Sequence, residues 1–168
     1  MTLAYVALGG NLGDPRRQLE DALAALARLP STRLLARSRL YRTPPWGVTA
    51  QPPFLNAAAA LDTALAPHAL LDALLGIERR AGRTREGERW GPRTLDLDLL
   101  HMDGVVLRGE RLTLPHPRIA GRAFVLLPLA ELAPQLELPG QGRVDALLAA
   151  ADATGCEPLL EPVQPAAG

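Results

Sequence analysis

Lysine is missing from this sequence of 168 residues, and all 18 of its basic residues are arginines. The absence excludes the phosphate-binding loop G-x-x-x-x-G-K-[ST], because that loop requires a lysine. Any phosphate group that the protein binds must therefore contact arginine side chains, backbone N–H groups or a metal ion.

The sequence also has only one cysteine, no formal net charge and no long apolar run. The single cysteine, Cys156, cannot form an internal disulfide, which is typical of the reducing cytoplasm. No apolar stretch reaches the length that crosses a membrane, and the N-terminus lacks the pattern of a secretory signal. The formal net charge is zero, so a polyanionic partner is not expected. We predict a cytoplasmic protein that binds neither nucleic acid nor a membrane.

Size and composition predict a single globular domain. Hydrophobic residues make up 48% of the chain, and its length is sufficient for a sizeable core. We expect residues 1–157 to form this domain and the Pro-rich residues 158–168 to form a loosely held tail. We expect the protein to be a monomer.

Hydrophobic periodicity predicts the order strand, helix, strand, strand, helix, strand in the first hundred residues. A Gly-rich turn at 9–13 should join the first strand to a helix capped by Asp14 and begun by Pro15. A proline-rich segment at 43–53 is expected to be an exposed loop. The predicted strands are 3–8, 32–42, 54–63 and the segment that starts near 95, and the predicted helices are 15–29 and 67–80.

The remaining residues predict shorter elements. Asp103-Gly104 is a hairpin signal between the segment that starts near 95 and a short strand at 105–107. A second short strand is expected at 112–114, and the turn at 115–118 should present the imidazole of His116. Further on we predict a helix at 119–132 broken by Gly121 and Pro128, a turn at 139–142 and a helix at 144–151.

The strand that follows residue 94 carries the clearest chemical signal. Leucines at 95, 97 and 99 alternate with Asp96 and Asp98, so both carboxylates point to one face of the strand. Their Cα atoms should be roughly 6.5–7 Å apart, and their like charges repel unless a cation lies between them. Mg²⁺ is commonly held by one or two carboxylates together with substrate phosphates. A solvated strand face is the alternative explanation of this pattern.

Four arginines lie in the Gly- and Pro-interrupted segment before this strand. The planar guanidinium group suits phosphate because it donates two parallel hydrogen bonds. Carboxylates on a rigid strand beside such a segment favour phosphoryl transfer from a nucleotide, although a solvated loop would have the same composition. These arginines are Arg83, Arg85, Arg89 and Arg93.

Two further polar residues each allow two interpretations. Asn56 interrupts an apolar strand, where its amide could pair with the polar edge of a heterocycle or make a local turn hydrogen bond. Glu78 lies near the C-terminus of a predicted helix, against the preference of the helix dipole. It could pair structurally with arginines or belong to a site.

Several spaced motifs together resemble the 6-hydroxymethyl-7,8-dihydropterin pyrophosphokinase family. The resemblance runs from about Ala4 to Pro134, and its most specific string is W-G-P-R-T-L-D-L-D at 90–98. The others are G-G-N-L-G at 9–13, Y-R-T-P-P at 41–45, F-L-N at 54–56 and L-P-H-P at 114–117.

The resemblance implies an α+β fold, namely a ferredoxin-like α/β sandwich with a largely antiparallel sheet, and transfer of diphosphate from ATP to a reduced pterin. It implies that Asp96 and Asp98 hold two Mg²⁺ ions and that Arg83 and Arg93 act in catalysis. The implied pterin-binding residues are Thr43, Pro44, Trp46, Phe54, Asn56, Trp90 and Phe124. The implied nucleotide-binding residues are Glu78, Arg85, Arg89, Trp90, Arg93, His116 and Arg122.

Three residues depart from the family pattern. Gly10 stands where serine is common, and Phe54 stands where tyrosine is common, which keeps the aromatic face and removes a hydroxyl. Pro117 replaces a frequent tyrosine and puts a nucleotide contact there in question. Two other classes of function compete with the enzyme: a non-catalytic ligand-binding module, since this fold hosts many, and a metal-dependent nuclease using the same aspartates.

Overall fold

The computed structural model describes residues 1–45, 50–82 and 95–159. In these ranges no helix combines the length and apolar character required to cross a membrane. Several residues of the predicted site lie outside the described ranges, and their assignments stay predictions. They are Trp46, Arg83, Arg85, Arg89, Trp90 and Arg93.

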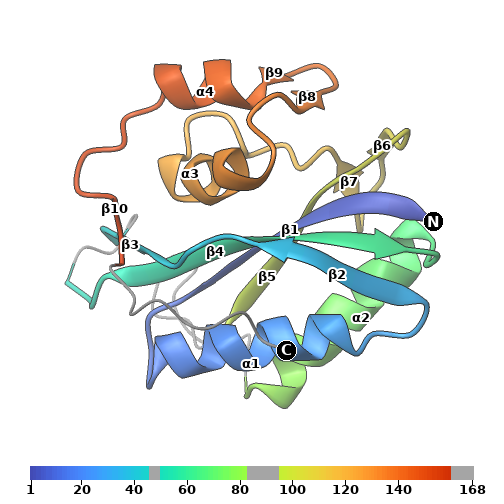
Figure 1. Cartoon of the computed structure of the whole chain (residues 1–168), viewed down its shortest axis with the longest axis horizontal. Helices are drawn as coiled ribbons and strands as arrows, with labels where there is room; N and C mark the ends of the chain where they lie inside the picture. The colour runs from blue at the N-terminus through green and yellow to red at the C-terminus, as the bar shows by residue number, and fades with distance from the viewer. Residues whose placement is uncertain (46–49, 83–94, 160–168) are drawn as a thin grey trace.

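A six-stranded antiparallel sheet forms the centre of the molecule (Figure 1). The strand β1 lies between β4 and β5, while β2 and β3 both pair with the other edge of β4. The last strand, β10, pairs with β3. Their bounds are β1 Thr2–Gly10, β2 Thr32–Arg37, β3 Tyr41–Thr43, β4 Phe54–Thr63, β5 Asp96–Met102 and β10 Glu157–Pro158.

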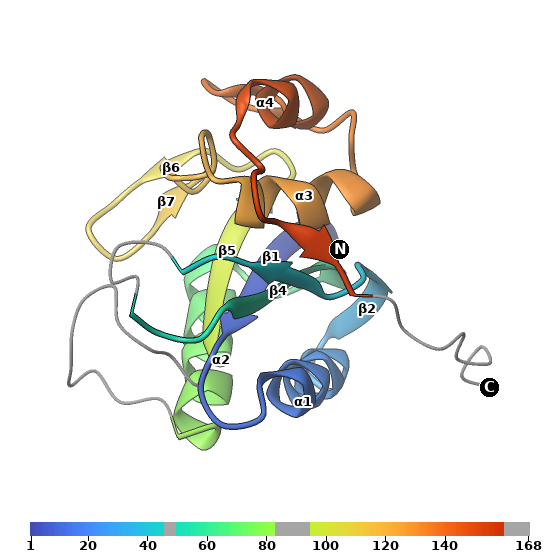
Figure 2. The same ribbon diagram turned by 90° about the vertical axis from the view of Figure 1, so that its left-hand side faces the viewer.

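Helices cover both faces of this sheet. Figures 1 and 2 show α1 (Pro15–Ala27) and α2 (Pro67–Arg80) on one face, and α3 (Ala123–Leu132) and α4 (Val144–Ala150) on the other. The strand residues sort by the period of two: Val6 and Leu8 belong to the core under α1 and α2, and Tyr5 to the core under α3 and α4. The predicted α+β sandwich is confirmed.

Two small hairpins complete the fold. The first pairs β6 (Leu107–Arg108) with β7 (Thr113–Leu114), and the second pairs β8 (Glu137–Leu138) with β9 (Gly142–Arg143). The turn at Asp103-Gly104 forms, with Gly104 at φ 74°, but the predicted hairpin there is wrong. β5 pairs with β1 instead, and its leucines at 97 and 99 lie in the core.

Local signals fixed several element boundaries correctly. The predicted bounds of β4 and α2 coincide with the observed ones; Pro53 stands before β4, and Pro67 is the first residue of α2. Asp14 caps α1, since its side chain accepts a hydrogen bond of 3.2 Å from the Arg17 N–H. α1 ends at Ala27 rather than Leu29, and Leu29 still packs against the core from beyond the helix.

The predicted strand 32–42 is two strands separated by a break at Ser38. The Ser38 N–H donates to the Ala58 carbonyl and the Ser38 hydroxyl accepts from the Ala58 N–H, both at 2.9 Å. A side-chain oxygen thus takes the place of a strand carbonyl, which is a known competition between serine side chains and sheet hydrogen bonds. The regular pairing resumes at Tyr41.

Other predicted boundaries also change. Gly9 and Gly10 belong to β1 rather than to a turn, because they pair with the first residues of β4. α3 starts at Ala123, after Gly121 at φ 83°, and continues through Pro128 without a break. Two residues of the expected tail contact the sheet: Pro158 pairs with Tyr41, and the Leu159 N–H donates to the Leu40 carbonyl at 2.9 Å.

Candidate functional site

The start of β5 presents two carboxylates on the face of the sheet that carries α3. Leu95, Leu97 and Leu99 are buried in the core on the opposite face, as their alternation with the aspartates predicted. Asp98 is exposed and Asp96 is half-buried. Since their Cα atoms should lie roughly 6.5–7 Å apart, a cation between them can contact both.

Three neighbouring strands place an amide and a carboxylate on either side of a glycine. Gly9 of β1 lies opposite Asn56 of β4 and also opposite Asp96 of β5. Residues that are opposite one another on paired strands point to the same face, so Asn56 and Asp96 flank a gap that Gly9 leaves without a side chain. The next row, Ala58–Ala7–Asp98, repeats the arrangement with small residues beside the second carboxylate.

Asn56 makes a cross-strand hydrogen bond in place of a local turn bond. Its side chain is 8% exposed, and its Nδ2 donates to Thr43 Oγ1 at 2.6 Å. The Oδ1 atom points over Gly9, only 2.6 Å from where a Cβ atom on that glycine would lie. The amide therefore directs an acceptor into the gap, and Phe54, opposite Thr43 in the register, lies two residues before Asn56 on the same face of β4.

The segment between β7 and α3 brings two basic side chains near Asp98. Burial lowers the pKa of His116, the charge of Asp98 raises it, and the charges of Arg122 and Arg118 lower it further. Burial also lowers the pKa of Arg122, as does Arg118, while Asp98 opposes the shift. The Arg122 guanidinium lies 5.5 Å from the centre of the Phe124 ring. The structure thus gathers His116, Arg122 and Phe124 near Asp98, one of the two carboxylates.

Hydrogen bonds fix the orientation of the His116 ring. The Arg118 N–H donates to His116 Nδ1 at 3.0 Å, so the neutral imidazole carries its proton on Nε2. The backbone is held as well, because the His116 N–H donates to the Leu100 carbonyl at 2.8 Å and Gln141 donates to the His116 carbonyl at 2.8 Å. His116 can therefore serve as a neutral hydrogen-bond donor to an anionic ligand.

We predict that His116 titrates below its ordinary pKa of 6.5. Because the unfolded chain binds this proton more readily than the folded protein, stability should decrease as pH falls below about 6.5. NMR titration of the ring protons checks the value, and the His116→Asn variant assigns the resonance among the three histidines. A midpoint above 6.5 would contradict the prediction.

Glu78 is buried in the last turn of α2 and reaches the strand of the carboxylates. It is 4% exposed, and its Oε2 accepts a hydrogen bond of 2.7 Å from the Leu97 N–H. That N–H lies between Asp96 and Asp98 in the chain, so Glu78 supports the backbone from which both carboxylates project. This bond gives the unfavourable place of Glu78 at a helix C-terminus a structural reason; its predicted contact with nucleotide stays a prediction.

Removing the Glu78 carboxylate should loosen this strand. We expect Glu78→Ala to lower the free energy of unfolding by about 1–3 kcal/mol, because a buried backbone donor loses its acceptor. The Mg²⁺ concentration for half-maximal activity should rise, since the carboxylates of Asp96 and Asp98 are less well held. Urea unfolding and Mg²⁺ titration measure the two effects, with the exposed Glu110→Ala as control; equal behaviour of both variants would refute the expectation.

The donor set suits a hard divalent cation bound jointly with phosphate. In the three described ranges, no group of three or more His, Cys, Asp or Glu side chains is arranged to hold a metal ion. Asp96 and Asp98 therefore do not form a complete protein cage there, whereas Mg²⁺ is usually held by one or two carboxylates plus phosphates and water. The exposure of Asp98 leaves room for such additional ligands.

Sequence reasoning found most of these side chains and missed their connections. Thr43 is buried beside Asn56, and Pro44 follows it at the exposed end of β3. Gly9 was read as part of a turn, and its place between Asn56 and Asp96 depends on strand register, which no local motif reports. Glu131 and Tyr41, which join α3 to β3, were also missed. An acidic residue in the last turn of a helix was the available signal.

Comparison with known proteins matches the chain to a family model and to named relatives. A family model described as "7,8-dihydro-6-hydroxymethylpterin-pyrophosphokinase (HPPK)" matches residues 5–134. A protein of Methylorubrum extorquens is 52% identical over 94% of this chain and 98% of its own length. One from Pseudomonas aeruginosa is 54% identical over 92% of this chain and 95% of its own length. Both are named 2-amino-4-hydroxy-6-hydroxymethyldihydropteridine pyrophosphokinase.

Solved structures share the fold at much lower identity. The Plasmodium falciparum HPPK-DHPS with pteroate superposes with a TM-score of 0.69 at 12% identity, over 89% of this chain and 42% of that longer chain. A structure of HPPK-DHPS in complex with substrates gives a TM-score of 0.66 at 13% identity, over 89% of this chain and 43% of the other. At this identity the likeness concerns the fold alone. The match to the family model and the identity to full-length relatives show that the chain belongs to the 7,8-dihydro-6-hydroxymethylpterin-pyrophosphokinase family.

Proposed function

We propose that this protein transfers diphosphate from ATP to the hydroxymethyl group of 6-hydroxymethyl-7,8-dihydropterin, releasing AMP, as a step of folate biosynthesis. Membership of the pyrophosphokinase family supports the activity. The observation that carries the site assignment is the row Asn56–Gly9–Asp96, which puts a polar amide and the carboxylate pair on one open face. This membership favours an enzyme over the alternative of a non-catalytic binding module or a nuclease.

The pterin would lie over Gly9 with its polar edge toward Asn56. A buried amide discriminates strongly between heterocycles, because a mismatched ligand leaves its donor and acceptor unpaired. Phe54 and Phe124 supply aromatic surfaces from β4 and α3, which suit stacking on a flat bicyclic ring. The hydroxymethyl group would then extend toward Asp96 and Asp98. Thr43, Pro44, Trp46 and Trp90 complete the proposed pterin-binding set.

The triphosphate would bind on the side of His116 and Arg122. Asp96 and Asp98 would hold two Mg²⁺ ions, which supply charge neutralisation and orientation of the phosphates when bound. His116 would donate its Nε2–H to a phosphate oxygen, and Arg122 would contribute positive charge. The predicted nucleotide contacts of Glu78, Arg85, Arg89, Trp90 and Arg93, and the catalytic roles of Arg83 and Arg93, belong to the same proposal.

The reaction forms one bond and breaks one bond. The hydroxyl oxygen of the pterin attacks the β-phosphorus of ATP, the bond from this phosphorus to the oxygen bridging to the α-phosphate breaks, and AMP leaves with that oxygen. The hydroxyl proton passes to solvent, since no side-chain general base is assigned. Asp96 and Asp98 orient the reacting groups, and the basic side chains offset the charge of the transferred group. We further propose that the enzyme is cytoplasmic and monomeric and binds neither nucleic acid nor a membrane.

One assay tests the proposal directly. The purified protein is supplied with ATP, Mg²⁺ and the hydroxymethyl dihydropterin, and the nucleotide products are separated. We expect AMP and the pterin diphosphate in equal amounts, with no turnover when Mg²⁺ is chelated. Formation of ADP would mean transfer of a single phosphate, and the absence of any pterin-dependent nucleotide product would overturn the proposal.

A further inference from the structure

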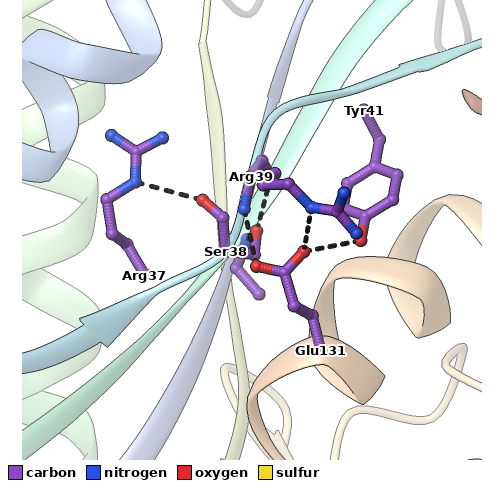
Figure 3. A network of polar contacts seen from close by, with 6 residues as sticks. Arg37, Ser38, Arg39, Tyr41 and Glu131 are labelled. Carbon is purple, nitrogen blue, oxygen red and sulfur yellow. Dashed lines mark hydrogen bonds and ion pairs between the residues drawn. The ribbon is translucent and has the colours of Figure 1, made fainter. Parts of the chain in front are cut away.

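Glu131 fastens α3 to the segment between β2 and β3. It is the residue before the last of the helix, and both of its carboxylate oxygens accept hydrogen bonds (Figure 3). Oε2 accepts from the Arg39 backbone N–H at 2.9 Å, and Oε1 accepts from Arg39 Nε at 3.0 Å and from the Tyr41 hydroxyl at 2.7 Å. One side chain therefore joins a helix to Arg39 in the segment between β2 and β3 and to Tyr41, the first residue of β3.

The break at Ser38 creates the place for this carboxylate. Because the Ser38 hydroxyl replaces a strand carbonyl, the chain turns out of the β4 pairing before Tyr41, and the Arg39 N–H points toward α3. Burial of Glu131 would raise its pKa, but hydrogen bonds from Tyr41 and from the backbone and side chain of Arg39 lower the pKa below its ordinary value. Glu131 is thus a charged anchor at neutral pH.

The two elements that Glu131 joins both carry proposed pterin-binding residues. On the sheet, Tyr41 lies opposite Asn56 in the register, and Thr43, which accepts the Asn56 hydrogen bond, is two residues further along the same face. On the helix, Phe124 precedes Glu131 by seven residues, so both lie on one side of α3 about 10.5 Å apart along its axis. The hydrogen bonds of Glu131 therefore connect the two groups of proposed pterin-binding residues, Phe124 on α3 and the Thr43–Asn56 pair on the sheet.

We propose that Glu131 is a positioning residue that sets the distance between Phe124 and the Thr43–Asn56 pair, and that it thereby determines how tightly the pterin is held. The inference rests on the proposed function, because it requires the pterin to lie between Phe124 and the Thr43–Asn56 pair. Glu131 itself touches the pterin at no point; it acts through Tyr41 and through the rotation of α3. Its effect should therefore fall mainly on pterin binding and less on ATP binding or on the chemical step.

Three variants separate the contributions of the anchor. Glu131→Ala removes all three hydrogen bonds, Glu131→Gln keeps an acceptor oxygen and the shape, and Tyr41→Phe removes one hydrogen bond only. Glu20→Ala is the matched control, because Glu20 of α1 accepts two hydrogen bonds from Arg37 Nη1, at 2.7 and 2.6 Å. Glu20 thus makes a comparable link to the sheet from the helix layer opposite α3 (Figure 1).

Steady-state kinetics with pterin and ATP varied separately provides the readout. We expect the KM for pterin to rise about tenfold in Glu131→Ala and about threefold in Tyr41→Phe, since hydrogen bonds to a charged group are strong and only part of their energy is transmitted to the pterin. Glu131→Gln should recover only part of the loss, because it keeps one acceptor oxygen but turns an amide NH2 toward an N–H donor of Arg39. The KM for ATP and kcat should change by less than the KM for pterin, at most about twofold to threefold, because Arg122 at the start of α3 is joined to this anchor whereas Asp96, Asp98 and His116 are not.

Each outcome decides between the two proposals. An unchanged pterin KM in a folded Glu131→Ala protein, or an equal rise in the KM for both substrates, overturns the positioning role while wild-type AMP formation upholds the proposed function. A similar effect of Glu20→Ala also overturns it, since any loosened helix would then suffice. If Glu131→Ala does not fold, Tyr41→Phe and Glu131→Gln carry the test. A wild-type protein that forms no AMP refutes the proposed function instead.

Discussion

Replacing Asp98 by alanine should reduce kcat by about a thousandfold while the protein stays folded. Bound metal ions commonly supply several kcal/mol of transition-state stabilisation in phosphoryl transfer, and about 4 kcal/mol corresponds to this factor. Asp98 is exposed and stands beside another carboxylate, so its removal takes away a repulsion rather than a packing contact. Asp96→Ala should behave similarly.

The test compares single-turnover rates at saturating Mg²⁺ with thermal melting of the same samples. The matched control is Asp21→Ala, which removes an equal charge from an exposed residue of α1 whose carboxylate lies 4.0 Å from Arg17 Nε. We expect the control to turn over normally and all variants to melt within a few degrees of the wild type. Near-normal turnover of Asp98→Ala would remove the carboxylate pair from the metal assignment.

The sequence anticipated those parts of the fold whose signals are local. α2 and β4 begin and end at the predicted residues, because Pro67 is the first residue of α2, Pro53 precedes β4, and the apolar pattern is clear within each element. The alternation of leucine and aspartate at the start of β5 was likewise sufficient to assign the faces of that strand, and burial of the leucines confirms it.

Features that depend on distant partners could not be read in the same way. Ser38 looks like one more residue of an alternating strand, and only the hydrogen bonds to Ala58 show that its side chain interrupts the pairing. Pro158 lies in a Pro-rich stretch that suggests a tail, yet it pairs with Tyr41 of β3. Gly9 and Gly10 suggest a turn by composition, whereas β4 pairs with both of them.

Acidic residues at helix C-termini were an informative signal that was only partly used. Glu78 was noticed because it opposes the dipole of α2, and its buried bond to Leu97 explains the misfit. Glu131 is likewise an acidic residue in the last turn of α3, where the helix dipole disfavours it, and it accepts a hydrogen bond from Tyr41 of β3. In both helices a carboxylate that is unfavourable locally is stabilised by a partner on the sheet, and both sheet segments lead to the site.

The second large effect should come from the smallest residue of the site. We expect Gly9→Ala to lower the affinity for pterin by about tenfold to a hundredfold and to leave ATP affinity nearly unchanged. The new Cβ would lie 2.6 Å from Asn56 Oδ1, so the amide must move, and its bond to Thr43 cannot keep its length of 2.6 Å. A displaced amide leaves the polar edge of the pterin unpaired, which costs about 1–3 kcal/mol.

A double-mutant cycle identifies the route of this effect. If Gly9→Ala acts through the amide, Asn56→Ala should weaken pterin binding by a similar factor, and adding Gly9→Ala to it should cost little more. Gly76→Ala is the control for the same chemical change: it lies in α2, its added Cβ meets no atom closer than 3.4 Å, and alanine favours the helix. Pterin affinity is measured by fluorescence titration. Additive effects of the two site substitutions would show that Gly9 acts independently of Asn56, and unchanged affinity in Gly9→Ala would place the pterin elsewhere, because a molecule lying across this row cannot avoid the displaced amide.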